Sequence, residues 1–402
     1  MSLSLKHAAA GLAGFLLTLA IIFTDELRAL AHLLDELASI EPDRIDETFR
    51  TLHLREDTVT VRNQGQAIPL PTQLAPSPFP ETYVWMDQIR NSEALILGTQ
   101  TTGIAVMHQG KLVFEKYDRG YGADTPATQM SVAKVYTSFL VGALLEDGKI
   151  QSLEDPIEDY LPELVDTAFE GVSIQNLLDM SSGVRWEEDL SNLDSEMVRA
   201  MIAEAIGEKD EFIRTLERIE EPGTYHRYAS INMHPLNELV AAASGMSFQA
   251  YMEERLWTPM GAEFPANVAD GGMTGGSLRD MLRFGQVYLD GGKNLLGQQI
   301  ISREWTDIST VPDHPRLEPG ADNPLSSSHH GYKHLWWIPI DYYRDFVALG
   351  VFGQFIYVNR EYDVVIAKTS AYQNEFEDGG WKLQETVALF KQTAAAMGES
   401  ID

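Results

Sequence analysis

The chain has 402 residues, of which 44% are hydrophobic and 22% are charged, a balance typical of a globular enzyme with a large core and two lobes. Its formal net charge of −30 argues against a nucleic-acid partner, because phosphate binding requires a basic surface. It contains no cysteine, which excludes disulfides, thiol catalysis and cysteine-based zinc sites.

The N-terminal segment differs in composition from the rest of the chain. Lys6 precedes an apolar run over residues 8–23, and acidic residues follow it. The run is slightly short for a membrane-spanning helix and long for the core of a signal peptide. We expect residues 1–25 to be an uncleaved anchor, which predicts an exported protein that is bound to the inner membrane or located in the periplasm. A cleaved signal peptide and a buried soluble helix are the alternatives.

Residues 26–82 are predicted to be an extended linker that contains one short helix. An amphipathic pattern covers Leu27 to Leu37, and the following stretch is polar and becomes rich in proline toward residue 80. The ordered domain is expected to occupy residues 83–402. It begins with a β-hairpin, because β-branched and aromatic residues flank the turn at residues 108–110.

A helix that follows this hairpin carries the first candidate catalytic pair. Ser131 and Lys134 are three residues apart, so their side chains share one helical face, and Gly148 is a plausible C-terminal stop. A serine hydroxyl becomes a good nucleophile only when a neighbour accepts its proton. A lysine can accept it if desolvation and the positive end of a helix dipole lower the pKa of the amine. The same short pattern also occurs by chance in buried helices.

The rest of the chain predicts a mixed fold of the α+β class. Residues 156–290 have mostly helical patterns with short loops, whereas residues 346–349, 354–358 and 364–367 have strand patterns. A last helix is expected over residues 382–396. Strands therefore lie near both ends of the ordered region, which predicts an antiparallel sheet flanked by helices, with an inserted, mostly helical lobe.

Three motifs, taken in their order, resemble the serine β-lactamase-like family. They are Ser-x-x-Lys at 131–134, Pro-Gly-Thr followed by Tyr-x-Ser within 222–230, and Leu-Gly-Val-Phe-Gly-Gln at 349–354. This family includes class C β-lactamases, D-alanyl-D-alanine peptidases, esterases and 6-aminohexanoate-dimer hydrolases. The likeness extends over about residues 101–370. Further matching segments are 171–186, 256–261, Gly331-Tyr332 and Trp336-Trp337.

The resemblance implies a serine hydrolase that cleaves an ester or amide through an acyl-enzyme on Ser131. Lys134 and Tyr228 would share the transferred proton, and either of them could be the base. The tetrahedral oxyanion needs two positioned donors. By resemblance these are the backbone N–H groups of Ser131 and Val351.

Three further residues are candidates for substrate binding. Gly350 suits a strand edge that a substrate approaches closely, and Ser230 would contact the substrate or Lys134. Trp186 would line the mouth of the pocket. The plainer interpretations are a helix cap for Ser230 and core packing for Trp186.

The sequence departs from the penicillin-recognising branches of the family. Residues 348–350 are Ala-Leu-Gly, where those enzymes usually carry Lys-Thr-Gly or His-x-Gly, and Ser230 stands where class C enzymes have asparagine. Both changes favour a less charged, small-molecule ester or amide. A D,D-peptidase or β-lactamase and a non-catalytic ligand-binding protein on the same fold are the alternatives.

No cofactor and no metal are expected. His329, His330 and His334 lie close together in the sequence, but no carboxylate or cysteine spacing supports a metal site. The acidic segment 187–190 is predicted to be a solvated loop, so that no glutamate-based deacylation is expected.

Overall fold

The computed structural model describes residue 41 and residues 44–399, with the exception of 55–57, 190–191, 270–271, 321, 341–344 and 374–379. The anchor predicted over residues 1–25 and the helix predicted over Leu27–Leu37 lie outside the described residues. Among the residues that are described, no helix is long and apolar enough to cross a membrane.

The centre of the fold is a seven-stranded antiparallel sheet, which contains the predicted hairpin and the three predicted C-terminal strands. Strands from both ends of the domain meet in it, because β4 pairs with β13. In spatial order the strands are β5 (Lys111–Tyr117), β4 (Thr101–His108), β13 (Val364–Ser370), β12 (Gln354–Asn359), β11 (Asp345–Gly350), β10 (Trp336–Ile338) and β9 (Gly331–Lys333).

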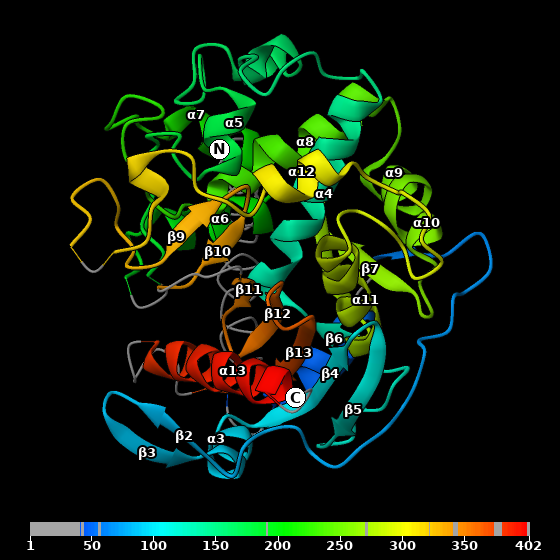
Figure 1. Ribbon diagram of the computed structural model, residues 1–402. Coiled ribbons are helices and arrows are strands. Elements are labelled where there is room, and N and C mark those ends of the chain that lie inside the picture. The colour runs from blue at the N-terminus through cyan, green and yellow to red at the C-terminus, as the bar shows by residue number, and fades with distance from the viewer. Residues whose placement is uncertain are drawn as a thin grey trace, which may run out of the picture.

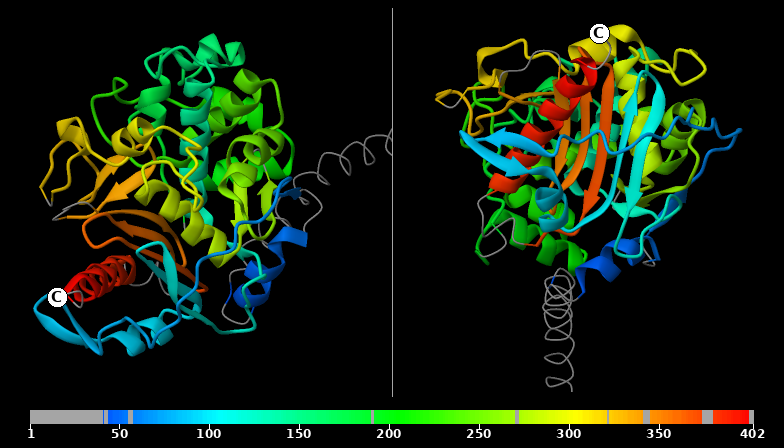
Figure 2. Two further views of the ribbon diagram at one scale, coloured as in Figure 1. Left: turned by 45° about the vertical axis from the view of Figure 1, so that its right-hand side comes forward. Right: turned by 60° about the horizontal axis from the view of Figure 1, so that its bottom comes forward.

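Helices cover both faces of this sheet, so the central strands are buried on both sides. Phe355 and Tyr357 pack against the C-terminal helix α13 (Trp381–Glu399), which lies across the strands in Figure 2. The opposite face packs against α11 (Leu278–Leu289). There Gly285 permits close contact, because an added Cβ would lie 2.6 Å from the Val365 side chain.

The second lobe is mostly helical, as the sequence predicted (Figure 1). Ser173 and Ser247 cap helices with their side chains, and Gly245 ends helix α8 (Met233–Ser244) in a left-handed conformation. The interval 156–290 also contains a β-hairpin of β7 (Ala266–Ala269) and β8 (Gly272–Gly276), which the sequence analysis did not separate from the helices. The helices are α5 (Ile174–Leu178), α6 (Glu196–Ala205), α7 (Lys209–Thr215), α8 (Met233–Ser244), α9 (Phe248–Met252) and α10 (Thr258–Met260), and α12 (Arg303–Ile308) follows later in the chain.

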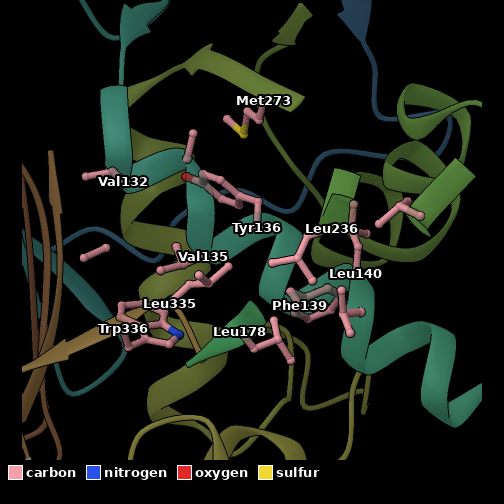
Figure 3. Packing of buried hydrophobic residues seen from close by; sticks show 14 of the residues in the cluster. Val132, Val135, Tyr136, Phe139, Leu140, Leu178, Leu236, Met273, Leu335 and Trp336 are labelled. Atoms are coloured by element: carbon pink, nitrogen blue, oxygen red, sulfur yellow. The ribbon is translucent and has the colours of Figure 1, made fainter. Parts of the chain in front are cut away.

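Helix α4 (Lys134–Glu146) connects the two lobes and forms the middle of the main core. Every residue from Val135 to Leu144 is buried, as expected for a helix surrounded by protein. Figure 3 shows apolar side chains that point from α4 toward neighbours on several other elements. At Gly142 an added Cβ would come within 2.3 Å of Trp305. The chain just before α4 is therefore held by a rigid core.

The segment before residue 83 is packed against the domain, although the sequence indicated only a linker. It contains α2 (Ile45–Thr51) and β1 (Val59–Val61), and β1 joins a small sheet of order β1-β7-β8-β6, where β6 is Ala127–Thr128. Its buried residues include Ile45, Phe49, Val61 and Leu70. Between β1 and residue 82 the chain forms no helix or strand apart from an isolated bridge between Thr72 and Leu112. A hairpin of β2 (Thr82–Trp85) and β3 (Gln88–Asn91) follows this segment, and helix α3 (Ser92–Gly98) then leads into the large sheet.

Candidate active site

Ser131 lies in a single 3-10 turn, Met130–Ala133, which leads directly into α4. Lys134 is the first residue of α4, and its Nζ donates a hydrogen bond of 2.9 Å to the Ser131 Oγ. The predicted spacing therefore does bring the hydroxyl and the amine together, on a helix start that the core fixes. For nucleophilic attack the bond must reverse, so that the hydroxyl donates to an unprotonated amine.

Tyr228 reaches this pair from the helical lobe. The Lys134 Nζ lies 5.4 Å from the centroid of the Tyr228 ring, a distance typical of a cation–π contact. No hydrogen bond of the phenol is found among the described residues. The ring stacks on Trp337 at 5.3 Å between centroids and 23° between planes, and it meets the edge of Tyr332 at 6.2 Å. This aromatic packing fixes the ring beside Lys134.

The wall that carries Tyr228 is tied together by buried polar groups. His226 is 0% exposed, its Nδ1 lies 2.9 Å from the Ser326 Oγ, and its ring packs at 4.9 Å on Tyr332. Burial lowers the pKa of His226 to about 4, so the imidazole is neutral at pH 7. The buried Lys333 ammonium lies 3.3 Å from Asp179, which joins β9 to the end of α5.

On the sheet side, the end of β11 lies directly against the turn that carries Ser131. A Cβ added at Gly350 would lie 2.7 Å from the Gln129 carbonyl oxygen and 3.1 Å from the Ser131 backbone nitrogen. Only glycine therefore permits this approach. The sequence predicted a close approach at Gly350, and the structure shows that its neighbour is the turn that carries Ser131. Val351 follows at the strand end.

A pocket of about 240 Å³ opens beside Ser131. Both lobes contribute to its walls, and Ser131 and Tyr228 face it together with the predicted residues Gly350 and Val351. The other lining residues are Glu188, Ser328, His330, Trp337, Leu349, Gly380, Leu383 and Gln384.

Two predicted substrate residues, Trp186 and Ser230, do not line this pocket. Trp186 is 8% exposed and belongs to the main core, and its Nε1 donates to the Glu188 Oε1 at 3.0 Å. The Ser230 backbone N–H donates to the same oxygen at 2.7 Å. Both residues therefore hold Glu188 in place without lining the pocket themselves. Trp186 packs in the core, which was the alternative interpretation, and does not lie at the pocket mouth.

Glu188 is the site residue that the sequence analysis missed. Glu187 and Glu188 are exposed, as expected for a solvated loop, but the loop is also held in place, since the Glu187 N–H donates to Glu196 at 3.0 Å and the Ser195 Oγ donates to the Asp189 carbonyl at 2.8 Å. These partners come from helix α6 and its N-cap, so the sequence of the loop alone does not predict the contacts. The result is one carboxylate in the pocket. Among the described lining residues it is the one acidic side chain.

His330 is a second polar residue of the pocket to which the sequence analysis assigned no role. It lines the pocket, and burial lowers its pKa to about 4, which keeps the imidazole neutral at pH 7. Trp337 lines the pocket beside it, whereas Trp336 is fully buried in the core. In the described part of the chain, no group of three or more histidine and carboxylate side chains is placed to hold a metal ion.

Comparison with known proteins gives one family and several relatives. The family model described as Beta-lactamase matches residues 93–388. A 6-aminohexanoate-dimer hydrolase of Paenarthrobacter ureafaciens is 26% identical over 293 residues, which cover 68% of this chain and 73% of the relative. A β-lactamase of Escherichia coli K12 is 26% identical over 169 residues, which cover 39% of this chain and 41% of the relative.

A solved structure agrees with the same fold. It is described as a candidate 6-aminohexanoate-dimer hydrolase from Bacillus anthracis, and it superposes with a TM-score of 0.74 at 23% identity. The superposition covers 90% of this chain and 96% of the other. At this identity the likeness concerns the fold.

Proposed function

This chain belongs to the β-lactamase family of hydrolases, and on that premise we propose that it is a serine hydrolase that cleaves a small-molecule ester or amide through an acyl-enzyme on Ser131. The observation that carries the proposal is the 2.9 Å contact between the Lys134 Nζ and the Ser131 Oγ at the edge of a pocket that Tyr228 also lines. A nucleophile, a basic partner and a phenol in one pocket are the groups that acyl transfer requires.

In the acylation step, the Ser131 hydroxyl attacks the substrate carbonyl while Lys134 takes its proton. Lys134 is favoured as the acceptor because it is the group in hydrogen-bond contact with the Ser131 Oγ. Tyr228, held beside the lysine, relays a proton to the leaving alcohol or amine. The oxyanion is stabilised by the backbone N–H groups of Ser131 and Val351. In the second step a water molecule attacks the acyl-enzyme, and its proton returns through the same Lys134 and Tyr228 pair.

The charges in the pocket support a neutral or cationic substrate over an anionic one. Glu188 presents a carboxylate to the pocket and Leu349 an apolar side chain, and the strand that carries Leu349 has alanine at residue 348, where the penicillin-recognising enzymes carry a lysine or histidine. A carboxylate on the substrate would therefore meet a like charge. This favours the esterase or amidase over a D,D-peptidase or β-lactamase, which the partial likeness to an E. coli β-lactamase keeps as the second candidate.

Substitution of the nucleophile tests the proposal. Ser131→Ala and Lys134→Ala should each lower the turnover of a p-nitrophenyl acyl ester by at least about 10³-fold while the circular dichroism spectrum stays unchanged. A fluorophosphonate should label the wild-type chain on the peptide that contains Ser131. Wild-type turnover that survives in Ser131→Ala would refute the mechanism, and strong labelling by a fluorescent penicillin would favour the second candidate. If the wild-type chain hydrolyses no ester or amide, the result would support the alternative of a non-catalytic ligand-binding protein on the same fold.

We also propose an exported, membrane-anchored location, which rests on the apolar run over residues 8–23 alone. Cell fractionation of the full chain tests it. Recovery in the soluble cytoplasmic fraction would contradict it.

A further inference from the structure

The N-terminal helix α2 places two buried side chains close to the active site. Ile45 is 0% exposed and Phe49 is 4% exposed, and both belong to a small apolar cluster with Phe352 and Ala371, here called the α2 cluster. The Phe49 and Phe352 rings meet edge to face, with 5.4 Å between their centroids. The α2 cluster is separate from the two larger cores.

The α2 cluster touches both chain segments that carry the proposed oxyanion donors. Met130 and Val351 pack against it. Met130 immediately precedes Ser131, and Phe352 immediately follows Val351. The two backbone N–H groups come from segments more than 200 residues apart in sequence, and one patch of apolar side chains joins those segments.

The backbone has an unfavourable conformation on both sides of this contact. Met130 has a φ of +49° and Phe352 a φ of +64°. Residues with a Cβ adopt this region at a cost and keep it only where the surroundings enforce it. Both residues stand next to a proposed oxyanion donor, and both contact the α2 cluster. The cluster is thus well placed to enforce both conformations.

Polar contacts fix α2 to the chain that leads into the nucleophile turn. The Arg119 Nε donates to the Asp46 carboxylate at 2.8 Å, at the start of the helix. The Thr128 Oγ1 donates to the Phe49 carbonyl at 3.3 Å, two residues before Met130. These contacts anchor α2 to the segment that runs from β5 to the Ser131 turn.

We propose that Phe49 is a positioning residue for the oxyanion hole. Helix α2, through Phe49, holds the turns at Met130 and Phe352 so that the Ser131 and Val351 N–H groups point at one oxygen. This role deepens the serine hydrolase function proposed above and rests on it. The sheet supplies a partial second support, because the Gln354 side chain donates to the Phe352 carbonyl at 3.3 Å. Loss of Phe49 should therefore weaken the oxyanion hole without abolishing it.

Three variants of the full chain test the proposal. Phe49→Ala should lower kcat for a p-nitrophenyl ester about 10- to 100-fold, with KM changed by no more than about 2-fold, because the oxyanion forms only in the transition state. Phe49→Leu refills most of the space and should restore kcat to within about 3-fold of wild type. Leu70→Ala is the matched control, since Leu70 is 7% exposed in the same N-terminal segment but packs on the main core. It should leave kcat within about 2-fold of wild type.

Amide hydrogen exchange separates this proposal from the function itself. Exchange of peptides that cover residues 129–133 and 350–354 should be faster in Phe49→Ala than in wild type, and unchanged in Leu70→Ala. If Phe49→Ala and Leu70→Ala lower kcat equally, or if exchange at those peptides does not rise, the positioning role is wrong. A wild-type chain without hydrolase activity would refute the proposed function, and exchange alone would then decide whether α2 holds the two turns.

Discussion

The two walls of the pocket are built in different ways. The sheet-side wall consists of the end of β11 and the turn before α4, and it is set by backbone in close contact and by apolar packing. The helical-lobe wall presents Glu188, Tyr228, His330 and Trp337, which are held by side-chain hydrogen bonds and ring stacking. The first wall carries the proposed backbone donors, which tolerate little change of shape. The second presents side chains that would contact the proposed substrate, and these can change individually. Four experiments test this contrast.

The sheet-side wall should fail on addition of a single methyl group. In Gly350→Ala the new Cβ would lie 2.7 Å from the Gln129 carbonyl oxygen, so β11 must move away from the Ser131 turn. We expect kcat to fall about 10²- to 10³-fold, as for the loss of one oxyanion donor. Steady-state kinetics with a p-nitrophenyl ester measures this. Gly98→Ala is the control, because no atom lies within 4 Å of its added Cβ. Equal activity of the two variants would mean that close backbone contact does not set this wall.

The helical-lobe wall should loosen in acid. Because burial lowers the folded pKa of His226 to about 4, the unfolded chain binds more protons as the pH falls below about 6.5. The contribution of His226 to the free energy of unfolding is therefore fully present above about pH 6.5, and it is lost as the pH falls toward 4. Between pH 7 and pH 5, His226 alone should lower the free energy of unfolding by about 2 kcal/mol.

Urea unfolding at several pH values measures this loss. The decline between pH 7 and pH 5 should be smaller in His226→Gln, which cannot titrate, even if that variant is less stable at every pH. Identical pH slopes in the two chains would show that His226 does not sense acid in the folded wall.

Removal of the ring that stacks on Tyr228 should have an intermediate effect. Trp337→Ala frees the Tyr228 ring from its 5.3 Å stacking partner, and we expect kcat to fall about 10-fold through poorer proton transfer. Tyr332→Phe is the matched control, since it keeps the neighbouring ring and removes only a hydroxyl that has no partner among the described residues. A decrease of similar size in the control would point to general damage of the wall.

The smallest change should follow neutralisation of Glu188. Glu188→Gln keeps an oxygen that can accept from Trp186 and from the Ser230 N–H, but it removes the charge. We expect kcat/KM for a carboxylate-bearing p-nitrophenyl ester to rise relative to a neutral ester, because a repelling charge is removed. The rise should be only about 5-fold, because the Glu188 side chain is exposed and its charge is screened. Glu187→Gln, one residue away and outside the pocket lining, should leave that ratio unchanged. An unchanged ratio in Glu188→Gln would exclude a role in charge selection.

Local patterns predicted one wall better than the other. Ser131 and Lys134 are three residues apart where a 3-10 turn leads into α4, so their proximity follows from helical spacing. The C-terminal strands were predicted within three residues at each end, because both of their faces are buried and their composition is distinctive. Glu188 was missed because most of the groups that hold its segment, namely Ser230, Glu196 and Ser195, lie elsewhere in the fold. Phe49 was missed because its helix is only seven residues long and pairs it with a single other buried residue, Ile45, within a mostly polar stretch, and only the tertiary structure shows what covers it.

Burial of the N-terminal segment has a practical consequence for recombinant production. Sequence alone suggests that expression could start at residue 83, where the apparent linker ends. A protein cut there would lack β1, which would leave β7 as an unpaired edge strand, and it would expose the apolar ring of Phe352 to solvent. Such a truncation should aggregate or be catalytically weak even though every motif residue is intact. Cloning boundaries for this protein should therefore begin no later than Glu41.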